Sequence, residues 1–304
     1  MPDVGFLYSG SHQSLGAQYD AFVNALPPGT SIFPNAGGSG KDNHYDQLLN
    51  EAKKFVDNHQ VRVVVAAGGT VCAQAARDGV AASGVPNTPV VFTSVTDPRG
   101  SGLYGNNLTG VAGMTAELDL IRLRLLQQAN PTITQIGVLR NTSRPNAPQL
   151  WANLQSKADP KLGLTEGPLP APPAPGQIRQ IIQNLLSGTV APPIQALLVT
   201  ADPMFNDLRS DVIRPGGAAL PVPAIYQWSE FVTDGGLMSF GPNLVEEYTA
   251  AGHYVGRILG GEQPQNIPLY QPTKCELVIN HGTAEALGLA LPRALVDRAD
   301  RVIK

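Results

Sequence analysis

The stretch Val63–Ala76, VVVAAGGTVCAQAA, decides the fold class of this chain. A run of β-branched and small apolar residues leads into two glycines and a threonine, and helix-favouring residues follow. This order predicts a buried strand, a tight turn at the glycines and a helix from Thr70 to Ala82. Because the first N–H groups of a helix have no partner within it, the junction also predicts a position for an anion.

The same alternation of strand and helix continues along most of the chain, which is typical of parallel α/β sheets. The first half is expected to contain strands at Val4–Tyr8, Val61–Ala67 and Pro89–Ser94 and helices at 14–26, 45–58 and 70–82. A second series is expected to contain helices at Glu117–Ala129 and around Ile178–Leu186 and strands at Gln135–Asn141, Ile194–Asp202, Val222–Gln227 and Leu237–Asn243. The restart of the pattern predicts two similar α/β halves.

The segment Gly163–Gly176, GLTEGPLPAPPAPG, contains five prolines and is a candidate linker. We interpret it instead as a connection inside the second half, because the β/α series resumes directly after it. Asn106–Gly113 is the better hinge candidate, since glycine and asparagine surround a single strand-like step there.

Composition excludes several classes of partner. At 304 residues the chain is long enough for two lobes with cores of their own. A net charge of −3 and a pI near 5.9 give no electrostatic footprint for nucleic acid or for an anionic membrane. No apolar run is long enough to span a bilayer. No secretory leader follows Met1, so a cytoplasmic protein or a mature secreted form is expected.

The sequence contains no recognisable set of catalytic or metal-binding residues. Cys72 and Cys275 are too few for a disulfide framework and lack the spacing of metal ligands, and the five histidines are scattered. The segment Asn35–Asp42, NAGGSGKD, departs from the phosphate-loop pattern at its first and last positions. We therefore expect no cofactor, no metal and no enzymatic activity.

Six ordered segments resemble the solute-binding proteins of a bacterial ABC uptake family, in particular its tryptophan/tyrosine-type group. Their most specific parts are TSVTDP at 93–98 and PTKCELVINHGTAEALGL at 272–289. The similarity covers nearly the whole chain. The six segments are VGFLYSGS, VVVAAGGTVCAQAA, TPVVFTSVTDPRGSGL, NLTGVAGMT, IGVLRNTSRPN and the stretch from Phe240 to Pro292.

The resemblance implies the fold of type I periplasmic binding proteins, in which two Rossmann-like lobes with parallel sheets are joined by a hinge of three chain crossings. It implies a first lobe of residues 1–111 and 243–270 and a second lobe of residues 112–242 and 271–304. The crossings are then expected near Thr109–Gly113, Ser239–Asn243 and Leu269–Cys275. Such lobes close around a ligand.

The resemblance also implies the surroundings in which the chain works. We expect a periplasmic or otherwise extracytoplasmic monomer whose signal peptide has been removed. Its partners are then a small-molecule ligand and an ABC permease in the membrane.

Candidate ligand contacts in the first half follow the ends of three strands, because ligands bind beyond the carboxyl ends of open parallel sheets. The helix start at Gly69, Thr70 and Val71 offers N–H donors, a hydroxyl and the helix dipole to a carboxylate. Its alternative role is a simple N-cap with a tight turn. The remaining candidates are Ser9, Gly10 and His12 after the first strand and Thr93, Ser94 and Asp97 after the third. Asp97 precedes Pro98, so its alternative role is a turn or an Asx cap.

In the second half, Asp202 is the preferred partner for an amino group of the ligand, with Asp97 and Glu230 as competing acids. Asn141 and Arg144 lie on the loop after a strand, where they reach the ligand or close the cleft. Arg144 is equally well explained as a solvated surface charge.

Aromatic side chains lie near the end of the strand at Val222–Gln227. Tyr226 and Trp228 straddle this strand end, where they stack on the ligand or brace the hinge. Phe240 is assigned to core packing.

These expectations describe a protein that traps a small carboxylate-bearing solute, above all an amino acid with an aromatic or apolar side chain. Two other functions stay open. A cysteine-dependent amino-acid racemase would use Cys72, although we prefer to interpret both cysteines as small buried hydrophobic residues. A sensory module would bind the same solute and signal to a receptor.

Overall fold

The computed structural model describes residues 3–10, 15–35, 45–95, 98–113, 115–143, 147–170, 173–189 and 191–304. The chain divides into two units. Unit 1 consists of Met1–Met114 and Leu244–Thr273, and unit 2 of Thr115–Asn243 and Lys274–Lys304. The chain therefore passes from one unit to the other three times.

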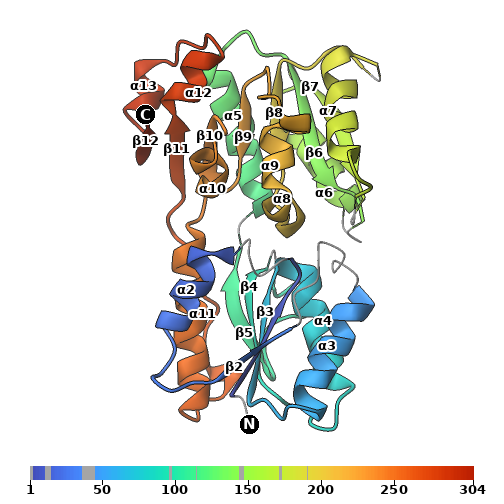
Figure 1. The fold of residues 1–304 in the computed structure, drawn as a ribbon, viewed down its shortest axis with the longest axis vertical. Coiled ribbons are helices and arrows are strands. Elements are labelled where there is room, and N and C mark those ends of the chain that lie inside the picture. The colour runs from blue at the N-terminus through green and yellow to red at the C-terminus, as the bar shows by residue number, and fades with distance from the viewer. Residues whose placement is uncertain are drawn as a thin grey trace. The chain divides into compact units, whose positions relative to one another are not determined.

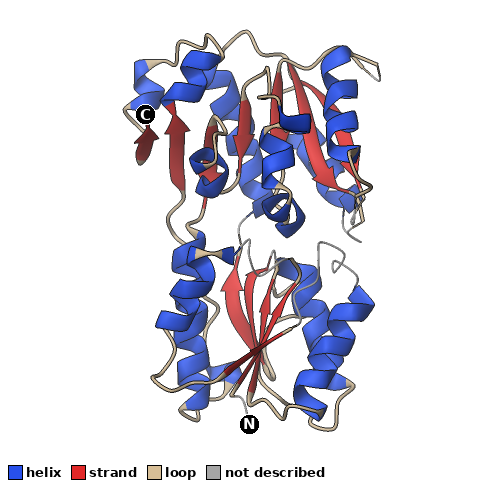
Figure 2. Cartoon of the chain, viewed as in Figure 1, coloured by secondary structure: helices blue, strands red, loops and turns tan. Residues whose placement is uncertain are grey.

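Unit 1 is built on a five-stranded parallel sheet with the order β2-β1-β3-β4-β5 (Figures 1 and 2). Its strands are β1 (Val4–Tyr8), β2 (Ile32–Pro34), β3 (Val63–Ala67), β4 (Val90–Val95) and β5 (Leu108–Ala112). Its helices are α2 (Ala17–Asn24), α3 (Tyr45–Asp57), α4 (Gly69–Ala81), α11 (Leu244–Leu259) and the short 3-10 helix η2 (Pro264–Asn266).

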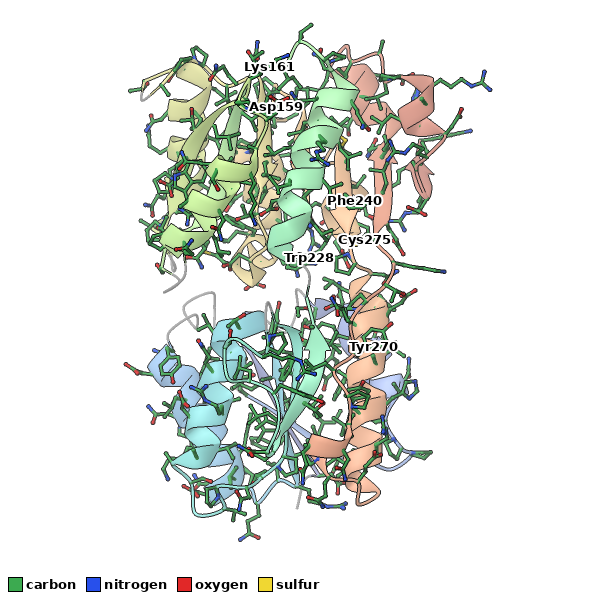
Figure 3. The ribbon with its side chains drawn as sticks, turned by 180° about the vertical axis from the view of Figure 1, so that it is seen from behind. Asp159, Lys161, Trp228, Phe240, Tyr270 and Cys275 are labelled. Atoms are coloured by element: carbon green, nitrogen blue, oxygen red, sulfur yellow. The ribbon has the colours of Figure 1, made fainter. Side chains whose placement is uncertain are left out.

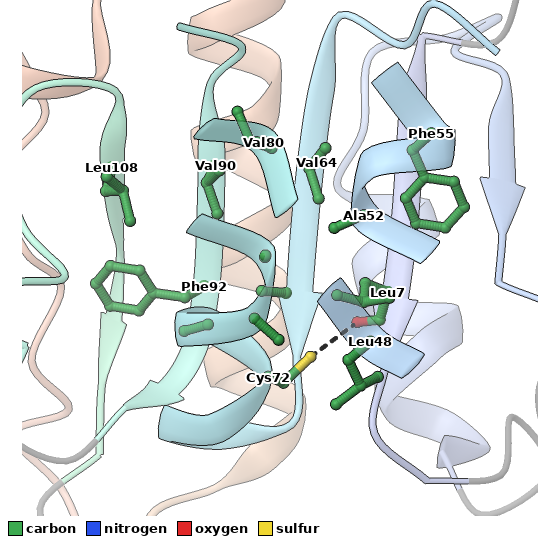
Figure 4. Packing of buried hydrophobic residues seen from close by; sticks show 14 of the residues in the cluster. Leu7, Leu48, Ala52, Phe55, Val64, Cys72, Val80, Val90, Phe92 and Leu108 are labelled. Atoms are coloured by element: carbon green, nitrogen blue, oxygen red, sulfur yellow. Dashed lines mark hydrogen bonds between the residues drawn. The ribbon is translucent and has the colours of Figure 1, made fainter. Parts of the chain in front are cut away.

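Both faces of this sheet are covered, which explains the uninterrupted apolar run of β3. Val64 and Ala66 pack in the cluster that includes α3 and α4, whereas Val63, Val65 and Ala67 pack in the cluster that includes α2 and α11. Figure 4 shows the first of these clusters from close by. A strand buried on both faces needs apolar residues at every position rather than at alternate ones.

Helices α3 and α4 approach each other closely at Gly79. A Cβ atom added there would lie 2.3 Å from the carbonyl oxygen of Leu49, which no side chain tolerates. The small residues of α4 therefore let this helix pack closely against α3. This packing holds the N-terminus of α4 at the end of β3.

Unit 2 is built on a seven-stranded sheet with the order β12-β11-β10-β9-β8-β6-β7. All neighbouring strands are parallel except β10 and β11, which are antiparallel. Its strands are β6 (Gln135–Asn141), β7 (Gly163–Leu169), β8 (Ala196–Val199), β9 (Ala224–Tyr226), β10 (Met238–Gly241), β11 (Glu276–Asn280) and β12 (Arg301–Ile303). Its longer helices are α5 (Thr115–Ala129), α6 (Ala147–Lys157) and α7 (Gln177–Ser187). The shorter ones are α8 (Pro203–Asp207), α9 (Arg209–Ile213), η1 (Pro215–Gly217), α10 (Ser229–Thr233), α12 (His281–Ala286) and α13 (Arg293–Val296).

The predicted α/β class with parallel sheets is confirmed, but the prediction for the proline-rich segment is wrong in its first part. Gly163–Leu169 is the strand β7 and pairs in parallel with all seven residues of β6. Strand β7 lies at the edge of its sheet, where Pro168 removes no inner ladder bond. A proline is therefore compatible with a strand at this edge position.

Within the described part of the chain, no helix has both the length and the apolar character needed to cross a membrane.

Candidate functional site

The glycine turn after β3 lies against the end of β1. Gly68 has a φ of +151°, and a Cβ atom there would lie 2.1 Å from the Ser9 Oγ atom. The Ser9 N–H donates to the carbonyl of Ala67 at 3.3 Å, and the Ser9 hydroxyl donates to that of Gly68 at 3.4 Å. The structure thus brings together two of the predicted strand ends, and glycine is required because no side chain fits between them.

Helix α4 begins directly at this turn, at Gly69, one residue before the predicted start. Gly69 itself has a φ of +74°. Thr70 and Val71 follow in the first turn and are half-buried, and Gly10 is buried after β1. Its N-cap residue, Gly68, has no side chain with which to cap the helix. The first N–H groups of a 13-residue helix therefore lie at the carboxyl edge of the unit 1 sheet.

Asn35 fixes the end of β1, which the sequence analysis missed. Its side-chain oxygen accepts from the Tyr8 N–H at 3.1 Å and its amide donates to the Tyr8 carbonyl at 3.1 Å. The side chain thus substitutes for a neighbouring strand just before Ser9 and Gly10. Its position one residue after the strand β2 was the available signal.

The end of β4 is irregular at Thr93 and Ser94. The pairing of β4 with β5 shifts between Phe92 and Val95, and Ser94 has a φ of +54°. A Cβ atom at Gly69 would lie 3.5 Å from the Ser94 carbonyl oxygen, so this strand end also meets the start of α4. Thr93 is buried beside the phenol of Tyr248 on α11. A non-glycine residue with positive φ is a feature concentrated at functional sites.

The irregular backbone directs Ser94 at a buried acid. Its hydroxyl donates to Oε2 of Glu247 in the first turn of α11. Glu247 is 1% exposed, and its Oε1 atom has no hydrogen-bond partner among the described residues. Burial raises the pKa of Glu247 to about 7, while the bond from Ser94 acts in the opposite direction.

Glu247 was not among the predicted site residues, although a signal for it exists in the sequence. Leu244, Glu247, Tyr248 and Ala251 follow the spacing of one helical face, and all four are buried. A glutamate on an apolar face is unusual, because an ionised carboxylate without a cation is costly to bury.

In unit 2, the predicted residues Asn141 and Asp202 are in contact. The Asn141 side-chain amide donates to Oδ2 of Asp202 at 2.9 Å, and the N–H of Met204 donates to Oδ1 at 2.9 Å. Asp202 is therefore the N-cap of the short helix α8. The Ser143 N–H donates to Oδ1 of Asn141 at 2.9 Å. These contacts give Asp202 and Asn141 a structural role at two neighbouring strand ends.

The predicted aromatic contacts of unit 2 are buried. Tyr226 stacks on Phe231 with ring centroids 4.8 Å apart, and burial raises the pKa of its phenol. Trp228, labelled in Figure 3, is 6% exposed and directly precedes α10, whose first turn contains Glu230. Between the two aromatic residues, the side-chain amide of Gln227 is buried and has no partner among the described residues.

Phe240 packs against the hydrophobic core of unit 2, as expected. Its carbonyl accepts from Nε of the buried Arg122 at 2.7 Å. Arg122 in turn forms a buried ion pair with Asp119 on the same helix. Phe240 and Arg122 therefore tie β10 to α5.

Three other candidates, His12, Asp97 and Arg144, lie outside the described residues.

The environment of Cys72 is that of a core residue. Its side chain is fully buried, burial raises the pKa of the thiol, and Sγ lies 3.6 Å from the Leu7 carbonyl oxygen (Figure 4). Cys275 belongs to the other unit and is partly buried. The described residues contain no group of three or more acids, histidines or cysteines that would hold a metal ion.

Solved structures with this fold include several binding proteins. The ABC domain from Streptococcus pneumonia in complex with L-Trp has a TM-score of 0.80 and 21% identity, and the match covers 99% of this chain and 100% of that one. A conserved domain protein from Vibrio cholerae has a TM-score of 0.80 and 22% identity, with 99% of each chain covered. An ABC transporter periplasmic solute binding protein from Actinobacillus succinogenes with bound D-allose has a TM-score of 0.64 and 13% identity, covering 94% of this chain and 100% of that one.

The first and the third of these similarities show that the fold is that of type I periplasmic binding proteins. No curated protein matches the chain. The sequence profile described as "ABC transporter substrate binding protein" matches residues 11–303, which is nearly the whole chain. The chain therefore belongs to the family of ABC transporter substrate binding proteins.

Proposed function

We propose that this chain is an extracytoplasmic solute-binding protein whose ligand is a small carboxylate-bearing molecule, specifically an amino acid with an aromatic or apolar side chain. The observation that carries the proposal is the start of α4 at the glycine turn after β3, where the N-cap residue is a glycine. Backbone N–H groups and the positive end of a helix dipole bind carboxylates without any further cation.

The surroundings of this helix start support the same assignment. Ser9 and the Ser94 carbonyl lie against the glycine turn, so two polar strand ends flank the first N–H groups of the helix. Thr70 adds a further hydroxyl in the first turn. We propose these residues, together with Gly10, Gly69, Val71 and Thr93, as the unit 1 part of the ligand site.

The proposed contacts from the second lobe are Asn141, Arg144, Asp202, Tyr226 and Trp228. Of these, Asp202 and Tyr226 already have structural partners. We therefore propose that they hold the site in shape and do not determine which ligand binds. The lobe boundaries expected from the resemblance, and closure about their hinge, remain part of the proposal. Ligand contacts made only in a closed form would shift the population towards it, and a permease would recognise that form.

Relatives of similar fold bind different solutes, since L-Trp is bound in one and D-allose in another. A thermal-shift screen separates these classes of ligand. We expect L-tryptophan, L-tyrosine or L-leucine to raise the melting temperature, because ligand at 100 times its dissociation constant adds about 2.7 kcal/mol to stability. A shift with D-allose or myo-inositol and none with amino acids would overturn the carboxylate assignment.

The proposed delivery of the solute to a permease has its own test. Reconstituted permease should take up a labelled amino acid only when this protein is present. A sensory module would support no uptake and would instead bind a receptor in its liganded form.

A further inference from the structure

The pair formed by Ser94 and Glu247 has features that the carboxylate site does not explain. The Ser94 hydroxyl already donates to one oxygen of Glu247, while the other oxygen has no hydrogen-bond partner among the described residues. Leaving a buried carboxylate oxygen unsatisfied is costly. A side chain kept in such a position is suited to a hydrogen-bond donor that arrives from outside.

The groups around Glu247 do not supply a compensating charge. Among the described basic side chains, none forms an ion pair with it. Tyr248 lies next to it on α11, and Tyr8 of β1 and Cys72 of α4 face Tyr248. Tyr248 and Cys72 are neutral at pH 7, because burial raises the pKa of both side chains. The missing partner is therefore best supplied by a cation.

The location of the pair matches the proposed ligand site. Ser94 is the fifth residue of the six-residue strand β4, and its carbonyl lies against Gly69 at the start of α4. An anion position at the helix start and an anionic side chain thus occur at the same edge of one sheet. A molecule that carries both a carboxylate and an ammonium group satisfies both positions.

We propose that Glu247, oriented by Ser94, accepts the ammonium group of an α-amino acid and selects amino acids against the same carbon skeletons without the amino group. This inference rests on the proposed function and assigns to Glu247 the role that the sequence analysis gave to Asp202. The two oxygens of Asp202 already accept bonds from Asn141 and Met204, whereas Glu247 retains an unused one.

Two matched ligand pairs test the selection by calorimetry. They are L-tryptophan with indole-3-propionic acid, and L-leucine with 4-methylpentanoic acid. We expect Glu247→Gln to weaken binding of the amino acid about 10- to 100-fold, the range for a lost bond to a charged group. The paired acid should change less than about twofold, because it lacks the group that Glu247 contacts.

Glu246→Gln is the matched control, since it removes the same charge from the neighbouring, exposed residue of the same helix turn. It should leave the preference for the amino acid unchanged. Thermal unfolding of both variants shows whether they are folded at the temperature of the titration.

A second measurement needs no variant. Only ionised Glu247 accepts an ammonium group, and its pKa without ligand is about 7. The affinity of the wild-type protein for L-tryptophan should therefore fall about tenfold from pH 8 to pH 6, while that for indole-3-propionic acid stays level. Protons should be released when L-tryptophan binds near pH 6.5.

The outcomes separate this inference from the proposed function. If the wild type binds amino acids but Glu247→Gln weakens both members of a pair equally, or both have the same pH profile, the role of Glu247 is wrong and the proposed function stands. If the wild type binds D-allose and neither amino acid, the proposed function fails and the assignment of Glu247 fails with it.

Discussion

Asn141 and Asp202 join the ends of β6 and β8 through a hydrogen bond of 2.9 Å between the Asn141 amide nitrogen and the Asp202 carboxylate. These strands are neighbours in the unit 2 sheet. The other carboxylate oxygen caps α8. One buried acid therefore holds the end of a strand and the start of the following helix, which is a structural role.

Asp202→Ala should lower the free energy of unfolding by about 2 kcal/mol, because it removes an N-cap and leaves the Asn141 amide without its acceptor. Urea unfolding measures this loss. Asp211→Ala is the control, since it removes an exposed acid from the adjacent helix α9 and should change stability by less than about 0.5 kcal/mol. The preference for L-tryptophan over indole-3-propionic acid should survive in Asp202→Ala if the protein remains folded. Its loss would return the amino-group role to Asp202.

Gly68→Ala should be strongly destabilising, by about 3 kcal/mol, and should abolish ligand binding. The added methyl group would overlap the Ser9 hydroxyl, and a φ of +151° is strained for alanine. Chemical unfolding and the thermal-shift assay measure the two effects.

Gly29→Ala separates strain from overlap, because Gly29 has a φ of +82° but nothing within 4 Å of an added Cβ atom. It should cost only about 1 kcal/mol and leave binding intact. Equal losses of stability and of ligand binding in Gly68→Ala and Gly29→Ala would show that the contact with Ser9 is unimportant.

The periodicity of the sequence predicts most of the fold because it records burial directly. Strands β1 and β6 have the predicted limits, and α4 differs from its prediction by one residue at each end. Strand β7 escaped prediction because Pro168 lies within it and further prolines follow, and only the sheet order reveals that it is an edge strand. The antiparallel pairing of β10 with β11 is likewise a tertiary property.

The candidate site was less accessible to sequence reasoning. Strand-end rules correctly place Ser9 next to the glycine turn and Ser94 near Gly69, since these rules follow from the topology of parallel sheets. Glu247 is more than 150 residues from Ser94, and the bond between them depends on α11 returning to the first sheet. A pattern along the chain identifies an unusual acid on an apolar helix face, such as Glu247, but it does not identify the residue that contacts this acid, here Ser94.

The burial of Cys72 predicts an unreactive thiol. In the native protein, iodoacetamide should modify Cys275 and leave Cys72 intact until the protein is unfolded, because burial raises the Cys72 pKa and removes access. Mass spectrometry of the digested protein locates the label.

Cys72→Ser tests the racemase alternative directly. The variant should lose about 1 kcal/mol of stability by burying a hydroxyl in an apolar cluster, yet should bind L-tryptophan with wild-type affinity. Neither protein should convert L-tryptophan to its D-isomer in a chiral chromatography assay. Turnover by the wild type that disappears in Cys72→Ser would establish the enzyme instead.

Glu247 should make the unliganded protein less stable as the pH rises through neutrality. Its pKa is raised from 4.5 to about 7 on folding, so the folded state binds more protons than the unfolded state between these values. The stabilising contribution is therefore complete below pH 4.5 and is lost as the pH rises through about 7, with a total of about 3 kcal/mol at 1.36 kcal/mol per pH unit. The difference in unfolding free energy between the wild type and Glu247→Gln, measured in urea from pH 4.5 to pH 8, should change by this amount in favour of the variant.

The corresponding difference for Glu246→Gln should remain nearly level, because that side chain is exposed. Parallel curves for the wild type and Glu247→Gln would mean that Glu247 is not buried as an uncompensated acid, and its role as an acceptor for a ligand cation would lose its physical basis.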